Sequence, residues 1–127
     1  MNLGLQFQYI DDKFIISANG QTFFIGDKLY FIGKLGSAVD DYKNMVLTHT
    51  KADENLIEIL TINGLKLLEK SNTYMVIYVD TPFIERYDSL IAKGFSKDMI
   101  KAMMEKEKEQ FENVDEYLND IPHLIIQ

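Results

Sequence analysis

Cysteine is absent from this chain of 127 residues, and only two histidines are present. Without cysteine, disulfide bonds and thiolate catalysis are excluded outright. A zinc site would have to be built from carboxylates and those two histidines, which is a poor supply of ligands. We therefore predict no metal centre and no cofactor.

Arginine is almost absent as well. The chain has 13 basic residues, of which only Arg86 is an arginine. Phosphoryl-transfer sites favour arginine, because its planar fork holds phosphate oxygens in pairs and stabilises the charge that develops on the transferred group. A chain with one arginine is therefore poorly equipped for that chemistry.

Long apolar runs are also missing. No run approaches the roughly 18 residues that a membrane span needs, and the N-terminus lacks the basic start of a secretory signal. The 20 acidic residues outnumber the 13 basic ones and give a net charge of -7, which disfavours binding to a nucleic-acid backbone. We predict a soluble, acidic, cytoplasmic protein that binds neither nucleic acid nor membrane.

Hydrophobic residues make up 46% of the chain, which is enough to form one buried core. We predict a single domain over residues 1–127 of mixed α/β (α+β) class. It divides into an antiparallel β-meander at 1–36, a short helix and loop at 37–55, and a β-α-β-α-α-β unit at 56–127.

The predicted meander consists of four short apolar runs, 5–10, 14–18, 22–25 and 29–32, separated by turn signals. Asn19-Gly20 is the strongest of these signals, because both residues tolerate the positive φ of a tight two-residue hairpin. The spacing predicts four antiparallel strands.

A short helix is predicted at 37–46, with Ser37 as its N-cap. The polar stretch 48–55 that follows has the composition of a loop. His49 lies alone in it, so we assign it no chemistry.

Longer units follow from residue 56. Residues 74–79 are a nearly continuous apolar run of strand length, which is typical of a parallel strand buried on both faces. Thr81 can cap the next helix, Pro82 can take its first position, and Gly94 follows its end at Lys93. The complete prediction is strand 56–62, helix 65–70, strand 74–79, helix 82–93, helix 96–119 and strand 123–126.

The helix predicted at 96–119 carries an apolar stripe that we expect to pack on the sheet. Its members recur at steps of three and four residues. They are Ile100, Met103, Met104, Phe111, Val114 and Leu118.

Four segments resemble, in their order, the later half of guanylate kinases and related nucleoside monophosphate kinases, which are P-loop proteins. These segments are residues 59–68, 76–82, 90–94 and 99–109. The resemblance covers about 56–126. It implies a strand that ends in acidic residues, a second strand with a Pro-containing turn, an arginine-rich lid, a long charged helix and a closing strand.

The chain departs from that family where catalysis would reside. Thr61 and Asn63 stand where the resemblance implies the strand-end acids that hold magnesium and acceptor nucleotide. The two lid arginines align with Ser89 and Lys93, and the arginine of the following helix aligns with Ala102. Lys93 alone keeps a cation, and lysine cannot form a bidentate clamp.

The phosphate loop that opens such kinases is also missing. Residues 33–37 have suitable residue types, but a phosphate loop needs four residues between its glycines. The meander corresponds, by position only, to the small subdomain that grips the acceptor nucleotide. Such a remnant needs a substitute central strand, either from its own meander or from a partner chain, so a homodimer is one hypothesis.

Two functions follow from this interpretation. The first is a non-catalytic protein-interaction or inhibitor protein on a degenerate, truncated kinase-like scaffold, acidic enough to engage a basic protein partner. The alternative is a nucleotide-binding protein or a weakly active guanylate kinase-like enzyme that takes a nucleoside monophosphate. Open α/β sheets bind ligands at the C-terminal ends of their strands, which makes Thr61, Asn63, Asp80 and Lys93 the candidate nucleotide-binding residues in this alternative.

Overall fold

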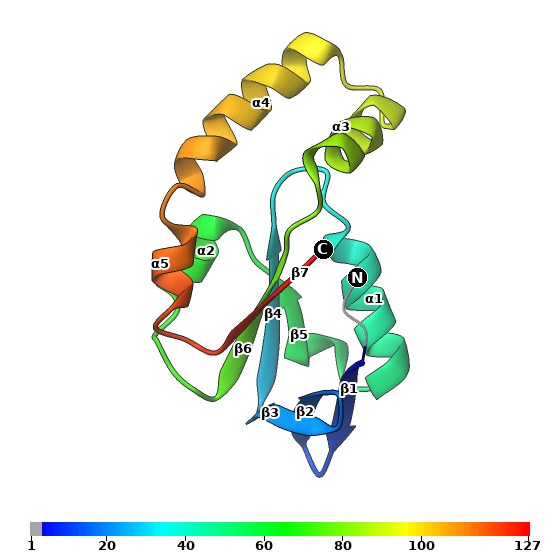
Figure 1. Ribbon diagram of the computed structural model, residues 1–127, viewed down its shortest axis with the longest axis vertical. Coiled ribbons are helices and arrows are strands. Elements are labelled where there is room, and N and C mark those ends of the chain that lie inside the picture. The colour runs from blue at the N-terminus through cyan, green and yellow to red at the C-terminus, as the bar shows by residue number, and fades with distance from the viewer. Residues whose placement is uncertain (1–3) are drawn as a thin grey trace.

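The computed structural model describes residues 4–127, so the first three residues of the predicted meander lie outside the described residues. It confirms the mixed α/β class, with one antiparallel and one parallel sheet (Figure 1). The antiparallel sheet contains β1 (Leu5–Ile10), β2 (Lys13–Ala18) and β3 (Gln21–Gly26) in that order. Asn19 and Gly20 join β2 to β3 with φ of 52° and 82°, as predicted for the hairpin.

The parallel sheet has the order β5-β4-β6-β7. Its strands are β4 (Lys28–Gly33), β5 (Ile57–Ile59), β6 (Tyr74–Val79) and β7 (His123–Ile126). The prediction that β4 is a fourth meander strand is therefore wrong. Residues 29–32 are all buried, so they form a strand covered on both faces, which is typical of a parallel sheet. β4 lies between β5 and β6 in the parallel sheet.

Alternation along β4 and β6 divides the core into two layers. Leu29, Phe31 and Ile77 pack on one face, against the meander and α1 (Val39–Thr50). Tyr30 and Val76 pack on the other face, against α2 (Ile62–Leu67) and α5 (Val114–Leu118). The parallel sheet is thus the middle layer of the molecule.

The remaining helices are η1 (Glu54–Leu56), α3 (Phe83–Ala92) and α4 (Lys97–Gln110). Figure 1 shows α3 and α4 extending as a pair beyond the ends of the parallel strands, away from the meander. Within residues 4–127, no helix combines the length and the apolar character that crossing a membrane requires.

The first helix begins and ends later than predicted. Ala38, not Ser37, precedes its first residue, and the Ser37 hydroxyl donates to the Lys34 carbonyl instead. The helix continues to Thr50, whose hydroxyl donates to the carbonyl one turn earlier. His49 therefore lies in the last helical turn rather than in a loop, and it is exposed.

The helix predicted at 65–70 in fact begins at Ile62. The Thr61 hydroxyl accepts a hydrogen bond from Gly64 N at 3.0 Å and caps α2, so the residues expected to end the strand form the first helical turn. The predicted strand 56–62 shortens to Ile57–Ile59 for the same reason.

The predicted single helix 96–119 is two helices. Ser96 caps α4 as expected, accepting from Met99 N at 3.2 Å, but α4 ends at Gln110. Phe111 then turns inward against Tyr78, with ring centroids 5.8 Å apart. The stripe expected to pack on the sheet does so only from Phe111 onward, and Ile100 is the one buried residue of α4.

Candidate functional site

The C-terminal ends of the parallel strands form one edge of the sheet, where open α/β folds bind ligands. Gly33 ends β4, Thr61 follows β5 and Asp80 follows β6. The loop from β4 to α1, residues 33–38, lies at this edge beneath α3 and α4. We take this edge as the candidate site.

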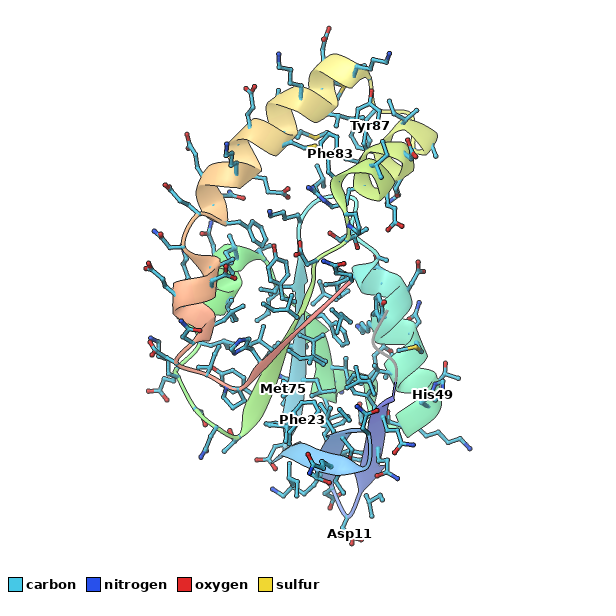
Figure 2. The ribbon with its side chains drawn as sticks, in the orientation of Figure 1. Asp11, Phe23, His49, Met75, Phe83 and Tyr87 are labelled. Atoms are coloured by element: carbon cyan, nitrogen blue, oxygen red, sulfur yellow. The ribbon has the colours of Figure 1, made fainter. Side chains whose placement is uncertain are left out.

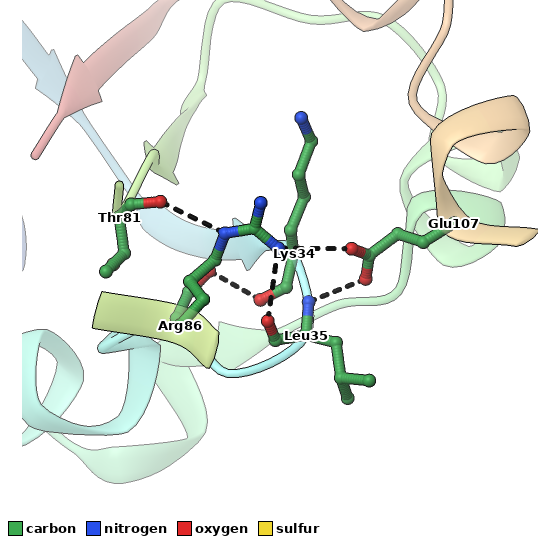
Figure 3. Close-up of polar contacts among 6 residues, drawn as sticks. Lys34, Leu35, Thr81, Arg86 and Glu107 are labelled. Atoms are coloured by element: carbon green, nitrogen blue, oxygen red, sulfur yellow. Dashed lines mark hydrogen bonds and ion pairs between the residues drawn. The ribbon is translucent and has the colours of Figure 1, made fainter. Parts of the chain in front are cut away.

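Arg86 lies at the centre of this edge and is only 9% exposed. Its Nε donates to the Thr81 carbonyl at 3.1 Å, and its terminal nitrogen donates to the Leu35 carbonyl at 3.4 Å. The same nitrogen lies 3.5 Å from the Glu107 carboxylate. Figure 3 shows the guanidinium, which α3 carries, between these groups from α4 and two loops. The single arginine thus connects four separate segments.

The backbone of the β4–α1 loop is bound by the protein's own side chains. Leu35 N donates to Glu107 Oε2 at 2.6 Å, and Ala38 N donates to the Thr81 hydroxyl at 3.1 Å (Figure 3 draws the first contact). Oriented backbone N–H groups at such a loop are a common anion site. Here a carboxylate of the chain itself occupies one of these donors.

Glycine is required where this loop passes under α3. Gly36 has φ of +80°, and a Cβ built on it would lie 2.7 Å from the Arg86 carbonyl oxygen. A side chain at this position would push the loop away from α3. The close approach keeps the Leu35 carbonyl within reach of the guanidinium.

The segment has the strand–loop–helix context of a phosphate-binding loop but not its residues. In the motif GxxxxGK[ST], glycine, lysine and a hydroxyl residue follow the first glycine after four positions. Counted from Gly33, these positions hold Ala38, Val39 and Asp40. Val39, at the position where the motif has its phosphate-binding lysine, is buried in the core and packs there.

The four residues predicted from the sequence separate into different surroundings. Thr61 and Asn63 line one cleft of 290 Å³ together with Gly33 and Glu107. Lys93 lines a second cleft of 380 Å³ between α3 and the start of α1. Asp80 is half-buried after β6 and lines neither of these two clefts. Thr81, expected to cap α3, instead binds Ala38 N.

Sequence reasoning missed the role of Arg86 and Glu107. Arg86 carried a signal, because a lone arginine in a lysine-rich chain usually has a geometric task that lysine cannot perform. Glu107 carried none, since it lies in a run of alternating Lys and Glu. Neighbouring Tyr78 is also buried, and burial, with Asp80 and Asp115 adding to it, raises its pKa to about 12.

Within residues 4–127, no cluster of three or more His, Asp or Glu side chains is placed to hold a metal ion. Comparisons with protein-family models, with curated proteins and with solved structures found no match. The candidate site therefore rests on its own geometry.

Proposed function

We propose that this chain is a non-catalytic protein-interaction or inhibitor protein on a degenerate, truncated nucleoside monophosphate kinase-like scaffold. The observation that carries the proposal is the contact between Glu107 and Leu35 N at 2.6 Å. A phosphate at this loop would meet a carboxylate of the same sign where it needs a free N–H donor.

The remaining residues of the loop support the same conclusion. Val39 and Asp40 replace the lysine and the hydroxyl that bind phosphate and magnesium, and Asp40 adds negative charge. Arg86, the only residue able to clamp a transferred phosphoryl group bidentately, is committed to Thr81, Leu35 and Glu107. Under this proposal, the cation and the backbone donors at the strand ends stabilise the fold and do not bind a nucleotide.

Exposed apolar residues favour interaction with another protein. Phe83 is 58% exposed and Ile84 is 61% exposed, both on the first turn of α3. Large apolar side chains that gather on one protruding element are typical of interaction surfaces.

One observation favours the alternative, a nucleotide-binding protein or weakly active kinase. Thr61 and Asn63 line the same cleft of 290 Å³ at the strand ends. In that case a nucleoside monophosphate would contact this pair.

Titration with nucleotides distinguishes the two. We expect no phosphotransfer between ATP and any nucleoside monophosphate in the presence of Mg²⁺, and no thermal stabilisation by millimolar nucleotide. A ligand at a hundred times its dissociation constant would stabilise the fold by about 2.7 kcal/mol, so millimolar nucleotide would reveal a dissociation constant of about 10 μM or below. Measured turnover would end the proposal. Amide shifts at Thr61, Asn63, Asp80 and Lys93 on adding a nucleotide would favour the alternative.

A further inference from the structure

A groove separates α3 from α4 on the protruding end of the molecule. It has a volume of 280 Å³ and an apolar floor, to which α3 contributes Phe83 and Tyr87, and α4 contributes Ile100 and Met104. Figure 2 shows the two labelled aromatic side chains between the helices. The groove is separate from the strand-end clefts that contain Thr61, Asn63 and Lys93.

The two aromatic side chains of the floor pack against each other. The rings of Phe83 and Tyr87 stack with centroids 6.0 Å apart and planes inclined by 28°. The Arg86 guanidinium also lies over the Phe83 ring, 6.0 Å from its centroid. Aromatic side chains held in place lose little conformational entropy when a partner covers them, which makes them strong anchors.

Lysines line one wall of the groove. Lys97, Lys101 and Lys108 recur at steps of four and seven residues, so they share one side of α4. Glu105 is the one acid among the lining residues, so three lysines against one acid leave a local charge of +2 in a chain of net charge -7. Among residues 4–127, none of these three lysines lies within 4.0 Å of a carboxylate oxygen, whereas other lysines do, such as Lys28 with Glu58.

We propose that this groove binds an acidic, amphipathic helical segment of a partner protein. Apolar anchors at helical spacing would cover Phe83, Tyr87 and Met104, and flanking Asp or Glu residues would pair with the lysines. The inference rests on the proposed function and identifies the surface that would bind the partner. It replaces the basic partner expected from net charge with an acidic one, because the local charge at the groove is opposite to that of the whole chain.

A displayed library of random peptides, selected on the intact protein, tests the occupant directly. We expect enrichment of peptides with Asp or Glu around two or three large apolar residues at helical spacing. The selected peptides are then synthesised with a fluorophore, and their dissociation constants are measured by anisotropy. The groove variant is Lys97→Glu, Lys101→Glu and Lys108→Glu, which we expect to weaken binding at least tenfold.

A matched control variant carries the same change in net charge at exposed lysines outside the groove, Lys51→Glu, Lys66→Glu and Lys106→Glu. It should weaken binding less than threefold. Phe83→Ala, an exposed position, should weaken binding without unfolding the protein, which circular dichroism checks. Enrichment of peptides without acidic residues, or equal binding by groove and control variants, would overturn the proposal.

Two other occupants would also overturn it. One is a second copy of the chain, seen as a concentration-dependent dimer in sedimentation that the groove variant abolishes. The other is a membrane surface, seen as binding to phosphatidylserine vesicles that the groove variant alone loses. Failure of the peptide experiment leaves the nucleotide titrations unaffected, so the two proposals fail separately.

Discussion

Arg86 and Glu107 form an ion pair that connects α3 to α4 across the β4–α1 loop. Their side chains are 11% and 14% exposed, and the closest nitrogen and oxygen are 3.5 Å apart. Each partner also binds the loop, Arg86 at the Leu35 carbonyl and Glu107 at the Leu35 amide. A single residue of the loop is thus held from both sides, which couples the position of the protruding helix pair to the sheet edge.

Breaking this pair from one side should destabilise the protein. Arg86→Met leaves the Glu107 carboxylate without its cation, and Glu107→Met leaves the guanidinium without its anion, each at a cost of about 3 kcal/mol. The double variant should be clearly more stable than the sum of the two losses implies, because neither charge remains uncompensated. Urea denaturation of the four proteins gives the coupling energy. Strictly additive losses would show that the pair carries no coupling.

The loop contacts predict a selective change in amide exchange. Glu107→Ala removes the acceptor of Leu35 N, and Thr81→Val removes the acceptor of Ala38 N. We expect at least tenfold faster hydrogen exchange at Leu35 in the first variant and at Ala38 in the second.

Each variant is the control for the other, and the amide of Ile77 in central strand β6 reports any global loss of stability. If both loop amides accelerate equally in both variants, the loop opens as one unit and the contacts do not act separately.

Much of the fold follows from local sequence signals. The hairpin at Asn19-Gly20 and the cap at Ser96 are short-range chemistry, in which a side chain or a glycine acts within three residues. The parallel strand at 74–79 was equally clear, because its run is apolar at every position. These signals need no knowledge of distant contacts.

The sequence-based prediction is wrong where contacts between distant residues determine the structure. Residues 29–32 are continuously apolar, like residues 74–79, but the turn signals that precede them favour a hairpin. Only the pairing of β4 with β5 and β6 places it inside the parallel sheet. The end of α4 at Gln110 depends on the packing of Phe111 against Tyr78. Glu107 is one glutamate among many until the fold brings it to Leu35, 72 positions away.

The position of α2 can be tested with two leucines of the same helix. Leu65 is fully buried against the core, whereas Leu67 is 87% exposed. Leu65→Ala should cost about 3 kcal/mol, because it removes buried apolar surface and leaves a cavity. Leu67→Ala should change the free energy of unfolding by less than about 0.5 kcal/mol. Denaturant titration measures both, and similar losses in the two variants would contradict the burial of Leu65 and the exposure of Leu67.

Tyr78 predicts a loss of stability at high pH. Its pKa is raised from 10.0 to about 12, first by burial and then by Asp80 and Asp115. Between these values the unfolded chain releases the phenol proton while the folded chain retains it, so the folded state binds more protons. The free energy of unfolding therefore falls as pH rises from 10 toward 12, by up to about 1.4 kcal/mol per pH unit from this group.

Tyr78→Phe removes the titrating hydroxyl and keeps the ring that packs on Phe111. The variant should match the wild type near pH 7 and be more stable above pH 10, with the difference growing with pH. Urea titrations at pH 7, 10 and 11 measure this difference directly. Since lysines and other tyrosines titrate in both proteins alike, their contribution cancels in the comparison. Parallel stability curves for the two proteins up to pH 11 would mean that Tyr78 ionises as readily in the folded protein as in the unfolded chain.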